Sequence, residues 1–221
     1  MKLTLFDLDN TLIAGDSDFE WAQFLMTKGA VDRERYEARN RDFLAEYRAG
    51  TLDIQAFLDF QLAPLARYPR RDLLVWRNEF VRERILPLIT AQARDLVAQE
   101  QGEAHVVAIV TATNRFVTEP IAAAFGIHDL IATEPEVGED GEYTGRVQGI
   151  PSFREGKITR VDEWLRDRDQ GWGSFTETAF YSDSLNDLPL LSRVSRAVAV
   201  DPDDTLAAHA RAQGWPIISL R

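Results

Sequence analysis

The chain has 221 residues and a formal net charge of −11, which argues against nucleic acid or an anionic membrane surface as a partner. Hydrophobic residues make up 45% of the sequence, enough for one large domain or for a core domain with a smaller insertion. Cysteine is absent, so disulfides, thiolate catalysis and cysteine zinc sites are excluded. Two acids interrupt the N-terminal apolar stretch, and no run approaches the roughly 20 apolar residues of a membrane span. A soluble cytoplasmic protein is therefore expected.

The first predicted element is a short buried strand at residues 3–6, followed directly by Asp7 and Asp9. The two acids would share a face if the strand continued. Carboxylates at the end of a buried strand are costly unless a bound cation or a hydrogen-bonded loop compensates them. In open α/β sheets this strand edge is also where ligands bind. A polar turn at Asn10 and Thr11 is the alternative interpretation.

Residues 16–85 carry helical patterns and no convincing strand. An acidic, cap-like start at residues 16–18 precedes the first of four amphipathic helices, which are predicted at 19–27, 32–49, 53–66 and 71–85. Pro64 lies inside the third pattern and favours a helix end before it. The short links between the helices predict a small bundle. We interpret its stripes of aromatic residues, such as Tyr36, Phe43 and Tyr47, as bundle core rather than as a cofactor site.

Beyond residue 87, predicted helices and strands alternate. The strands are expected at 105–110, 129–133, 178–182, 197–200 and 217–218, and the helices at 88–100, 115–125, 157–168, 185–193 and 205–213. Glycines between Val137 and Tyr143 predict a β-hairpin. The alternation predicts an α/β fold, a parallel sheet with helices on both faces. The core domain would comprise residues 1–15 and 86–221, with residues 16–85 inserted over the carboxyl edge as a four-helix cap domain.

Polar residues fall at the ends of these strands or at helix starts, and together they suit phosphomonoester hydrolysis. That reaction needs a barrier reduction of about 20 kcal/mol or more. One carboxylate can serve as the nucleophile, and a second acid can protonate the leaving oxygen and then activate water. Mg²⁺, which prefers carboxylates and waters, offsets the repulsion between the nucleophile and the phosphoryl oxygens. A hydroxyl and an ammonium can hold the remaining oxygens.

Four ordered segments resemble the four motifs of the haloacid dehalogenase (HAD) superfamily. They are Asp7-Leu-Asp9-Asn-Thr11, Val110-Thr111, Lys157 and Ser182-Asp183-Ser-Leu-Asn186-Asp187. The helical insertion between the first two is similar to the C1-type cap of the phosphoserine-phosphatase-like branch, subfamily IB. The resemblance covers nearly the whole chain and implies a Rossmann-like parallel core.

The resemblance also implies roles for the acids. Asp7 would be the nucleophile and a magnesium ligand. Asp9 would be the general acid and base, and its main-chain carbonyl would also bind magnesium. Asp183 would be a metal ligand, and Asp187 would support the metal shell. Taken alone, Asp187 could also be first-turn helix charge, favoured by the helix dipole.

The remaining motif residues would bind the phosphoryl group. The resemblance implies that Thr111 binds it with Lys157 beside it, and that Asn186 contacts the phosphate or the attacking water. On residue type alone, Thr111 could be a helix N-cap and Lys157 a solvated helix lysine. Arg154 or Arg160 could be mistaken for the motif lysine.

Departures from the family pattern concern the substrate. Phosphoserine phosphatases usually carry a glutamate after the first motif, and this glutamate binds the substrate's amino group. In this chain Asp16 stands at that place, and Asp18 or Glu20 could take over the role. Ser182 replaces a usual glycine, and residues 111–113 read Thr-Ala-Thr rather than Ser-Gly-Gly. These departures disfavour phosphoserine. Related bacterial proteins with a similar opening are histidinol-phosphatase-like, and two acids would suit a cationic amine.

The sequence therefore predicts a Mg²⁺-dependent phosphatase of a small phosphorylated metabolite, acting through an aspartyl-phosphate on histidinol phosphate or phosphoserine, with a cap that excludes water. A phosphotransferase with the same chemistry and a non-catalytic binding protein are the alternatives. A two-component receiver domain is disfavoured by length and by the insertion. The oligomeric state is left open, with a homodimer as one option.

Overall fold

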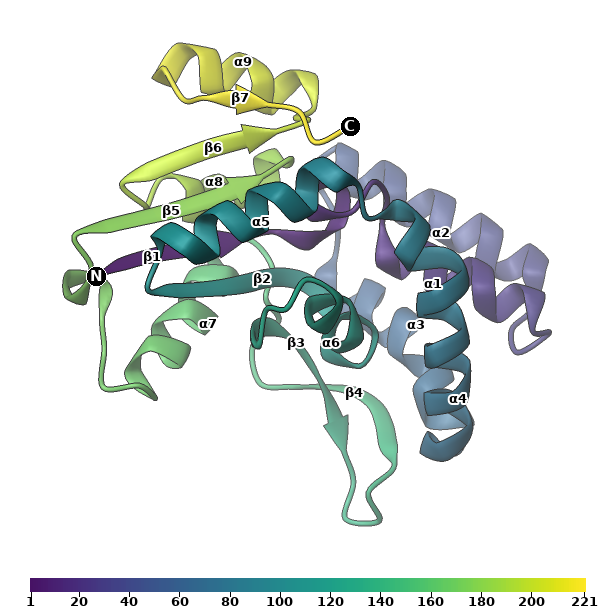
Figure 1. Cartoon of the computed structure of the whole chain (residues 1–221). Coiled ribbons are helices and arrows are strands. Elements are labelled where there is room, and N and C mark those ends of the chain that lie inside the picture. The colour runs from purple at the N-terminus through teal and green to yellow at the C-terminus, as the bar shows by residue number, and fades with distance from the viewer.

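A seven-stranded sheet in the order β4-β3-β2-β1-β5-β6-β7 forms the centre of the molecule (Figure 1). The computed structural model describes residues 1–221, except for the side chain of Arg48. All neighbouring strands are parallel except β3 and β4, which are antiparallel. The strands are β1 (Lys2–Phe6), β2 (Val106–Asn114), β3 (Asp129–Val137), β4 (Tyr143–Gln148), β5 (Glu177–Ser182), β6 (Arg196–Val200) and β7 (Ile217–Ile218). The predicted α/β class with a mostly parallel sheet is confirmed.

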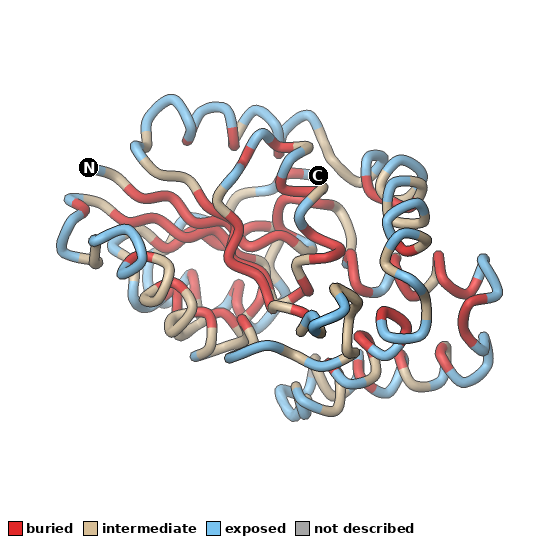
Figure 2. The backbone as a smooth tube through the Cα atoms, turned by 90° about the horizontal axis from the view of Figure 1, so that it is seen from below, coloured by how far each residue is buried: buried red, intermediate tan, exposed pale blue. Residues whose placement is uncertain are grey.

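Helices cover both faces of the sheet, so the central strands are buried on both sides (Figure 2). Along β1, Leu3 and Leu5 face one apolar cluster while Phe6 faces the other, as the two-residue period of a strand requires. One cluster contains residues of α5 (Ala91–Glu103) and α6 (Arg115–Ala124), and the other residues of α7 (Glu155–Arg166), α8 (Leu188–Leu191) and α9 (Asp204–Gln213). No helix in the described part of the chain is long and apolar enough to cross a membrane.

Four helices lie beyond the carboxyl ends of the strands, between β1 and α5 in sequence (Figure 1). They are α1 (Ser17–Thr27), α2 (Arg33–Arg48), α3 (Ile54–Arg67) and α4 (Arg70–Phe80). Asp16, Asp32 and Asp53 begin the first three by accepting hydrogen bonds from backbone N–H groups of the first turn. An aromatic cluster joins the group to the sheet layer, because Trp21 of α1 contacts Phe116 of α6 at 5.7 Å between ring centroids.

Several element boundaries differ from the sequence-based expectation. Helix α3 continues through Pro64 to Arg67, because the buried Leu62 and Leu65 pack on both sides of the proline and outweigh the missing hydrogen bond. The fourth helix is α-helical only to Phe80, and one π-type turn follows at Val81–Ile85. The element predicted at 185–193 is instead a 3₁₀ turn (Leu185–Asp187) followed by the short α8.

Strand β2 is longer than predicted and changes the role of one motif residue. It runs to Asn114, four residues beyond its expected end, and Asn114 then caps α6 by accepting from the N–H of Val117. Thr111 therefore lies within the strand, and its alternative interpretation as a helix N-cap is wrong. The hairpin β3–β4 packs against α3, where a Cβ at Gly145 would lie 3.0 Å from Ala66.

Candidate active site

The loop after β1 places Asp7 at the carboxyl edge of the sheet. The N–H of Asp7 donates to the carbonyl of Tyr181 at 2.9 Å, so the residue is fixed by continued pairing with β5. A turn at Leu8–Leu12 follows, in which Asn10 has a φ of 55° and reverses the chain. The Asp7 carboxylate is buried and accepts hydrogen bonds from Lys157 Nζ at 2.7 Å and from Thr11 Oγ1 at 3.0 Å.

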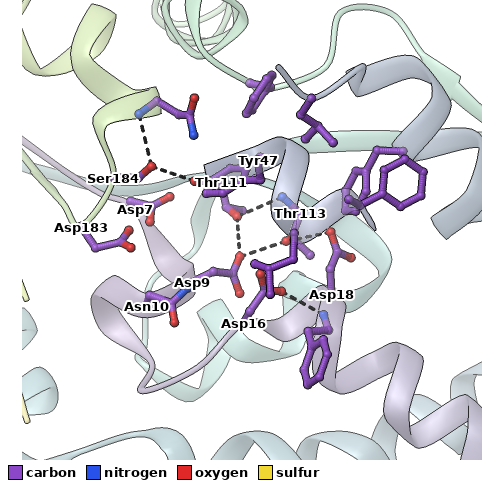
Figure 3. A pocket seen from close by; sticks show the side chains of 18 of the residues that line it. Asp7, Asp9, Asn10, Asp16, Asp18, Tyr47, Thr111, Thr113, Asp183 and Ser184 are labelled. Atoms are coloured by element: carbon purple, nitrogen blue, oxygen red, sulfur yellow. Dashed lines mark hydrogen bonds between the residues drawn. The ribbon is translucent and has the colours of Figure 1, made fainter. Parts of the chain in front are cut away.

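Asp7 and Asp183 lie close together, as the parallel strand ends predict (Figure 3). The Thr11 hydroxyl is 3.0 Å from Asp7 Oδ2 and 3.2 Å from Asp183 Oδ1. The N–H of Asp183 donates to this Thr11 hydroxyl oxygen at 3.0 Å. A hydroxyl carries one hydrogen, so it serves only one of the two carboxylates at a time. The carboxylate that the hydroxyl does not serve can therefore bind a further positively charged group.

Lys157 is buried and forms two ion pairs. Its Nζ lies 2.7 Å from Asp7 Oδ1 and 2.7 Å from Asp187 Oδ2, and the Ser182 hydroxyl donates to the latter oxygen. Burial would lower the pKa of Lys157, but the charges of Asp187 and Asp7 outweigh it and raise the pKa above its usual value. The ammonium therefore stays charged, and the alternative of a solvated helix lysine is wrong.

Negative charge is in excess around this lysine. Burial raises the pKa of Asp7 to about 7; the Lys157 charge lowers it, and Asp187 and Asp9 raise it further. Burial also raises the pKa of Asp183 well above its usual value, with further contributions from Asp7 and Asp187. Among the described side chains, Lys157 is the only cation that forms ion pairs with these acids, and its two partners are Asp7 and Asp187.

This donor set fits a divalent cation of the magnesium type. The described residues contain no group of three or more His, Cys, Asp or Glu side chains that could hold a metal by themselves. Mg²⁺ does not need such a group, because it commonly binds one or two carboxylates and keeps waters or phosphate oxygens as its other ligands. The carboxylates of Asp7 and Asp183, which share one hydroxyl, provide that kind of site.

Asp9 is held by four donors on the other side of the loop, and Figure 3 shows two of them, the hydroxyls of Thr111 and Thr113. Its Oδ1 accepts from the N–H and hydroxyl of Ser17, and its Oδ2 accepts from Thr113 at 2.9 Å and Thr111 at 3.2 Å. Burial raises the pKa of Asp9 to about 6 and the charge of Asp16 adds to this, while the hydrogen bonds from Ser17 and Thr113 oppose it. Such a group can change protonation state near neutral pH, as a general acid and base must.

A cavity of about 530 Å³ opens above these residues and reaches between the core and helices α1, α2 and α3. Its acidic wall is lined by Asp16, the N-cap of α1, and by Asp18 and Glu20 of that helix. Asp18 is buried and accepts from Thr113 at 3.1 Å and, with a longer contact, from Asn114. The volume is in the range of small-metabolite pockets.

Two polar contacts join the helical block to the core at this cavity. Tyr47 of α2 lies 2.8 Å from the Ser184 hydroxyl (Figure 3). Arg154 donates to the carbonyl of Gly50 at 2.7 Å and to the side-chain oxygen of Asn186 at 2.9 Å. Arg154 also has a φ of 51° and a ψ of −122°, an unusual backbone conformation for a residue with a side chain.

The structure brings all the predicted site residues to the cavity and adds others that the sequence interpretation missed. The predicted residues that line it are Asp7, Asp9, Asp16, Thr111, Lys157, Asp183, Asn186 and Asp187. Thr113 was missed, although it lies two residues after Thr111 and a strand would place both on one face. Arg154 was considered only as a substitute for Lys157. The roles of Tyr47 and Ser184 depend on packing between distant segments, which no local pattern signals.

Comparisons with known proteins agree with this arrangement. The sequence matches the haloacid dehalogenase-like hydrolases over residues 4–192. It is 47% identical over 220 residues to a histidinol-phosphatase of Neisseria meningitidis, covering 100% of this chain and 99% of that protein. It is 29% identical to a phosphoserine phosphatase of Mycobacterium tuberculosis, covering 98% of this chain and 70% of that one.

Solved structures give the same result for the fold. A Bordetella pertussis protein of unknown function is 46% identical, with a TM-score of 0.94 over 100% of this chain and 99% of that chain. A phosphoserine phosphatase in its apo form is 17% identical and has a TM-score of 0.67 over 100% and 94% of the two chains. With the family match over residues 4–192 and the relative at 47% identity, the chain belongs to the haloacid dehalogenase-like hydrolases and is a phosphoric monoester hydrolase.

Proposed function

We propose that this enzyme hydrolyses histidinol phosphate, with Mg²⁺, through an aspartyl-phosphate on Asp7. The observation that carries the proposal is the pair of carboxylates, Asp7 and Asp183, that share the Thr11 hydroxyl beside a buried lysine. This pair lies at one end of a cavity whose other wall is acidic. The proposed substrate comes from the relative with 47% identity, which is named as a histidinol-phosphatase.

The proposed chemistry has two displacements at phosphorus. In the first, a carboxylate oxygen of Asp7 attacks the phosphorus, the bond to the ester oxygen breaks, and protonated Asp9 gives its proton to the leaving alkoxide. In the second, the Asp9 carboxylate takes a proton from a water molecule whose oxygen attacks the same phosphorus. The bond to Asp7 then breaks, and inorganic phosphate and the free Asp7 carboxylate result.

Magnesium would be held by the carboxylates of Asp7 and Asp183 and by the main-chain carbonyl of Asp9. When bound, it supplies positive charge that offsets the repulsion between the nucleophile and the phosphoryl oxygens. We place Asp187 in a supporting role, because its Oδ2 is engaged by Lys157 and Ser182.

Three side chains would orient the phosphoryl group. The Thr111 hydroxyl, which donates to Asp9 at 3.2 Å, can rotate toward a phosphoryl oxygen. The Lys157 ammonium provides fixed positive charge between two acids. Asn186 lines the cavity, and Arg154 fixes its side-chain oxygen, so its amide N–H groups remain available to a phosphate or to water.

We assign residues 16–85 as a cap domain and residues 1–15 and 86–221 as the catalytic core. Two polar contacts support this assignment, since the link from Tyr47 to Ser184 and the link from Arg154 to Gly50 each join the helical block to the core. In this arrangement the cap covers the acids and limits the access of bulk water during transfer.

The substrate's ammonium group would lie against the acidic wall of the cap. Asp16, the N-cap of α1, and Asp18, in the first turn of that helix, both line the cavity, and Asp18 is buried there. An ammonium cation next to these carboxylates gains charge-assisted hydrogen bonds, and it relieves the repulsion between two acids that lie two residues apart. This wall supports an amino-alcohol phosphate over a plain alcohol phosphate.

The test is a measurement of phosphate release from histidinol phosphate, phosphoserine and 4-nitrophenyl phosphate, each with excess Mg²⁺ and after exhaustive treatment with EDTA. We expect the highest kcat/KM with histidinol phosphate, a loss of at least about 100-fold with EDTA, and recovery on adding Mg²⁺ back. Equal amounts of phosphate and free alcohol would separate hydrolysis from transfer to an acceptor. Full turnover after chelation would contradict the role of the metal, and a higher kcat/KM for phosphoserine would contradict the substrate.

A further inference from the structure

Two helices of the cap, α2 and α3, line one side of the cavity. The residues that face it repeat at intervals of three and four along each helix, which is one helical face. They are Asn40, Phe43, Leu44 and Tyr47 on α2, and Ile54, Phe57 and Gln61 on α3. Each stripe thus combines apolar residues with a single side-chain amide.

The two amides lie at the same level of the antiparallel helix pair. Phe60 of α3 contacts Tyr36 at 4.3 Å and Phe43 at 5.6 Å between ring centroids. Asn40 lies midway between Tyr36 and Phe43 on α2, so it is opposite Phe60 and its neighbour Gln61. The amides of Asn40 and Gln61 therefore meet the same region of the cavity.

Both amides are buried, and the amide nitrogen of Asn40 lacks a protein partner. Asn40 and Gln61 are only 8% and 5% exposed. Nδ2 of Asn40 is fully enclosed and has no hydrogen-bond partner among the described residues. Buried amides are nearly always paired, because an unpaired donor loses its bonds to water without replacement. Asn40 also lines the substrate cavity, so its unpaired amide can gain a partner on the substrate when the side chain turns toward the cavity.

The amides are at the right distance for the far end of a small ester. Tyr47, on the same stripe, contacts Ser184, which follows the proposed metal ligand Asp183. Asn40 precedes Tyr47 by seven residues, which is about 10 Å along a helix axis. The group that reaches Asn40 is therefore on the leaving alcohol and not on the phosphate.

We propose that Asn40 and Gln61 are specificity-determining residues that bind the two ring nitrogens of a neutral imidazole on the leaving alcohol; this rests on the proposed function. A neutral imidazole presents one N–H donor and one nitrogen acceptor, and each amide offers both an N–H and an oxygen. One amide donates to the bare ring nitrogen and the other accepts from the ring N–H. Phe43 and Phe57 provide the apolar wall against which the ring lies.

The test compares two substrates that differ by an imidazolylmethyl group. Histidinol phosphate carries an imidazole, and 2-aminoethyl phosphate keeps the ammonium and the ester without it. For Asn40→Leu and for Gln61→Met we expect KM for histidinol phosphate to rise roughly five- to tenfold, the equivalent of one lost hydrogen bond, with kcat changed less than about threefold. For 2-aminoethyl phosphate we expect kcat/KM to change less than about twofold.

The matched control is Gln55→Met, which makes the same change on the exposed face of α3, where the Gln55 side chain donates a hydrogen bond to Asp59. This control should leave kcat/KM unchanged for both substrates. Inhibition by inorganic phosphate should be unchanged and the melting temperature should not fall in any of the three variants, which separates loss of ring recognition from unfolding. Equal losses on both substrates, or no loss on either, would overturn the proposal. A wild-type enzyme that lacks any preference for the ring would overturn the proposed substrate as well, whereas a preference that survives both substitutions overturns this inference alone.

Discussion

Two buried carboxylate clusters share the central strands of this sheet and have opposite electrostatic character. In the first, Glu100 of α5 accepts from Thr4 at 2.6 Å, Tyr181 at 2.5 Å and Arg196 at 2.6 Å. In the second, at the carboxyl edge, the acids around Asp7 outnumber the single cation that contacts them among the described residues. Both Glu100 and Asp7 are nearly inaccessible to water.

The difference appears in the direction of the pKa shifts. Burial would raise the pKa of Glu100, but the hydrogen bonds from Thr4, Tyr181 and Arg196 outweigh it and lower the pKa below its usual value. For Asp7, burial and the neighbouring acids raise the pKa by more than the Lys157 charge lowers it, so the pKa rises to about 7. A structural carboxylate is therefore one whose partners are complete within the chain, whereas a functional one keeps capacity for a partner from outside.

The largest effect that would sharpen this comparison is the loss of activity in Asp7→Asn. An asparagine amide is a poor nucleophile toward phosphorus, so we expect phosphate release to fall by at least about 10⁴-fold. The free energy of unfolding should not fall, because the ionised Asp7 carboxylate is not fully compensated in the folded protein. Phosphate release under saturating substrate and urea unfolding monitored by circular dichroism measure the two quantities. Residual activity within tenfold of the wild type would remove Asp7 from the nucleophile role.

The opposite result is expected for Glu100→Gln. The amide cannot accept three charge-assisted hydrogen bonds, so we expect the free energy of unfolding at pH 7 to fall by about 1–3 kcal/mol. Because the cluster lies away from the cavity, kcat/KM should stay within about twofold. Glu103→Gln on the exposed end of the same helix is the control and should leave stability unchanged. If Glu100→Gln lost activity while keeping its stability, the structural assignment of this cluster would be wrong.

Sequence patterns predicted the part of this contrast that depends on strand ends. Asp7 and Asp183 follow two strands of the same parallel sheet, and such ends meet at one edge whatever the details of packing. The position of the two acids is thus set by local sequence and by topology, and both can be read along the chain. Lys157 was placed at the same site by the resemblance to the haloacid dehalogenase motifs, because on local sequence alone it could have been a solvated helix lysine.

Other parts of the site depend on packing that no local pattern encodes. The stripe with Phe43 and Tyr47 was predicted to be bundle core, but Phe43 also lines the cavity and Tyr47 contacts the catalytic core. The helical period places these residues on one face without telling whether a core, a cavity or solvent covers it; Leu44, on the same stripe, is 42% exposed. Similarly, the Glu100 cluster joins residues from four separate elements, and a lone glutamate in a helix gives no signal of it.

The smallest predicted effect is a difference in how the two clusters respond to pH in the metal-free protein. A carboxyl whose pKa is raised from 3.8 to about 7 on folding opposes folding once it ionises, so Asp7 should make stability fall as pH rises from about 4 to 7. Glu100 has the opposite sign: its pKa is lowered, so its contribution is present at neutral pH and is lost as pH falls below about 4.5.

Urea unfolding at pH 5 and pH 7.5 in EDTA measures the first slope, and we expect a decrease of on the order of 1 kcal/mol attributable to the acids at the carboxyl edge, since one pKa unit corresponds to about 1.4 kcal/mol. The net charge of −11 also disfavours folding at higher pH, so the slope must be compared with a variant that removes the same charge elsewhere. Asp7→Asn should flatten the slope, and Asp95→Asn, at an exposed position of α5, should not.

Excess Mg²⁺ should reverse the trend in the wild type, because ionised carboxylates bind the cation and add stability as its concentration exceeds the dissociation constant. Identical slopes in the two variants would mean that Asp7 and its neighbours are as fully compensated as Glu100, and the distinction between the two clusters would then disappear.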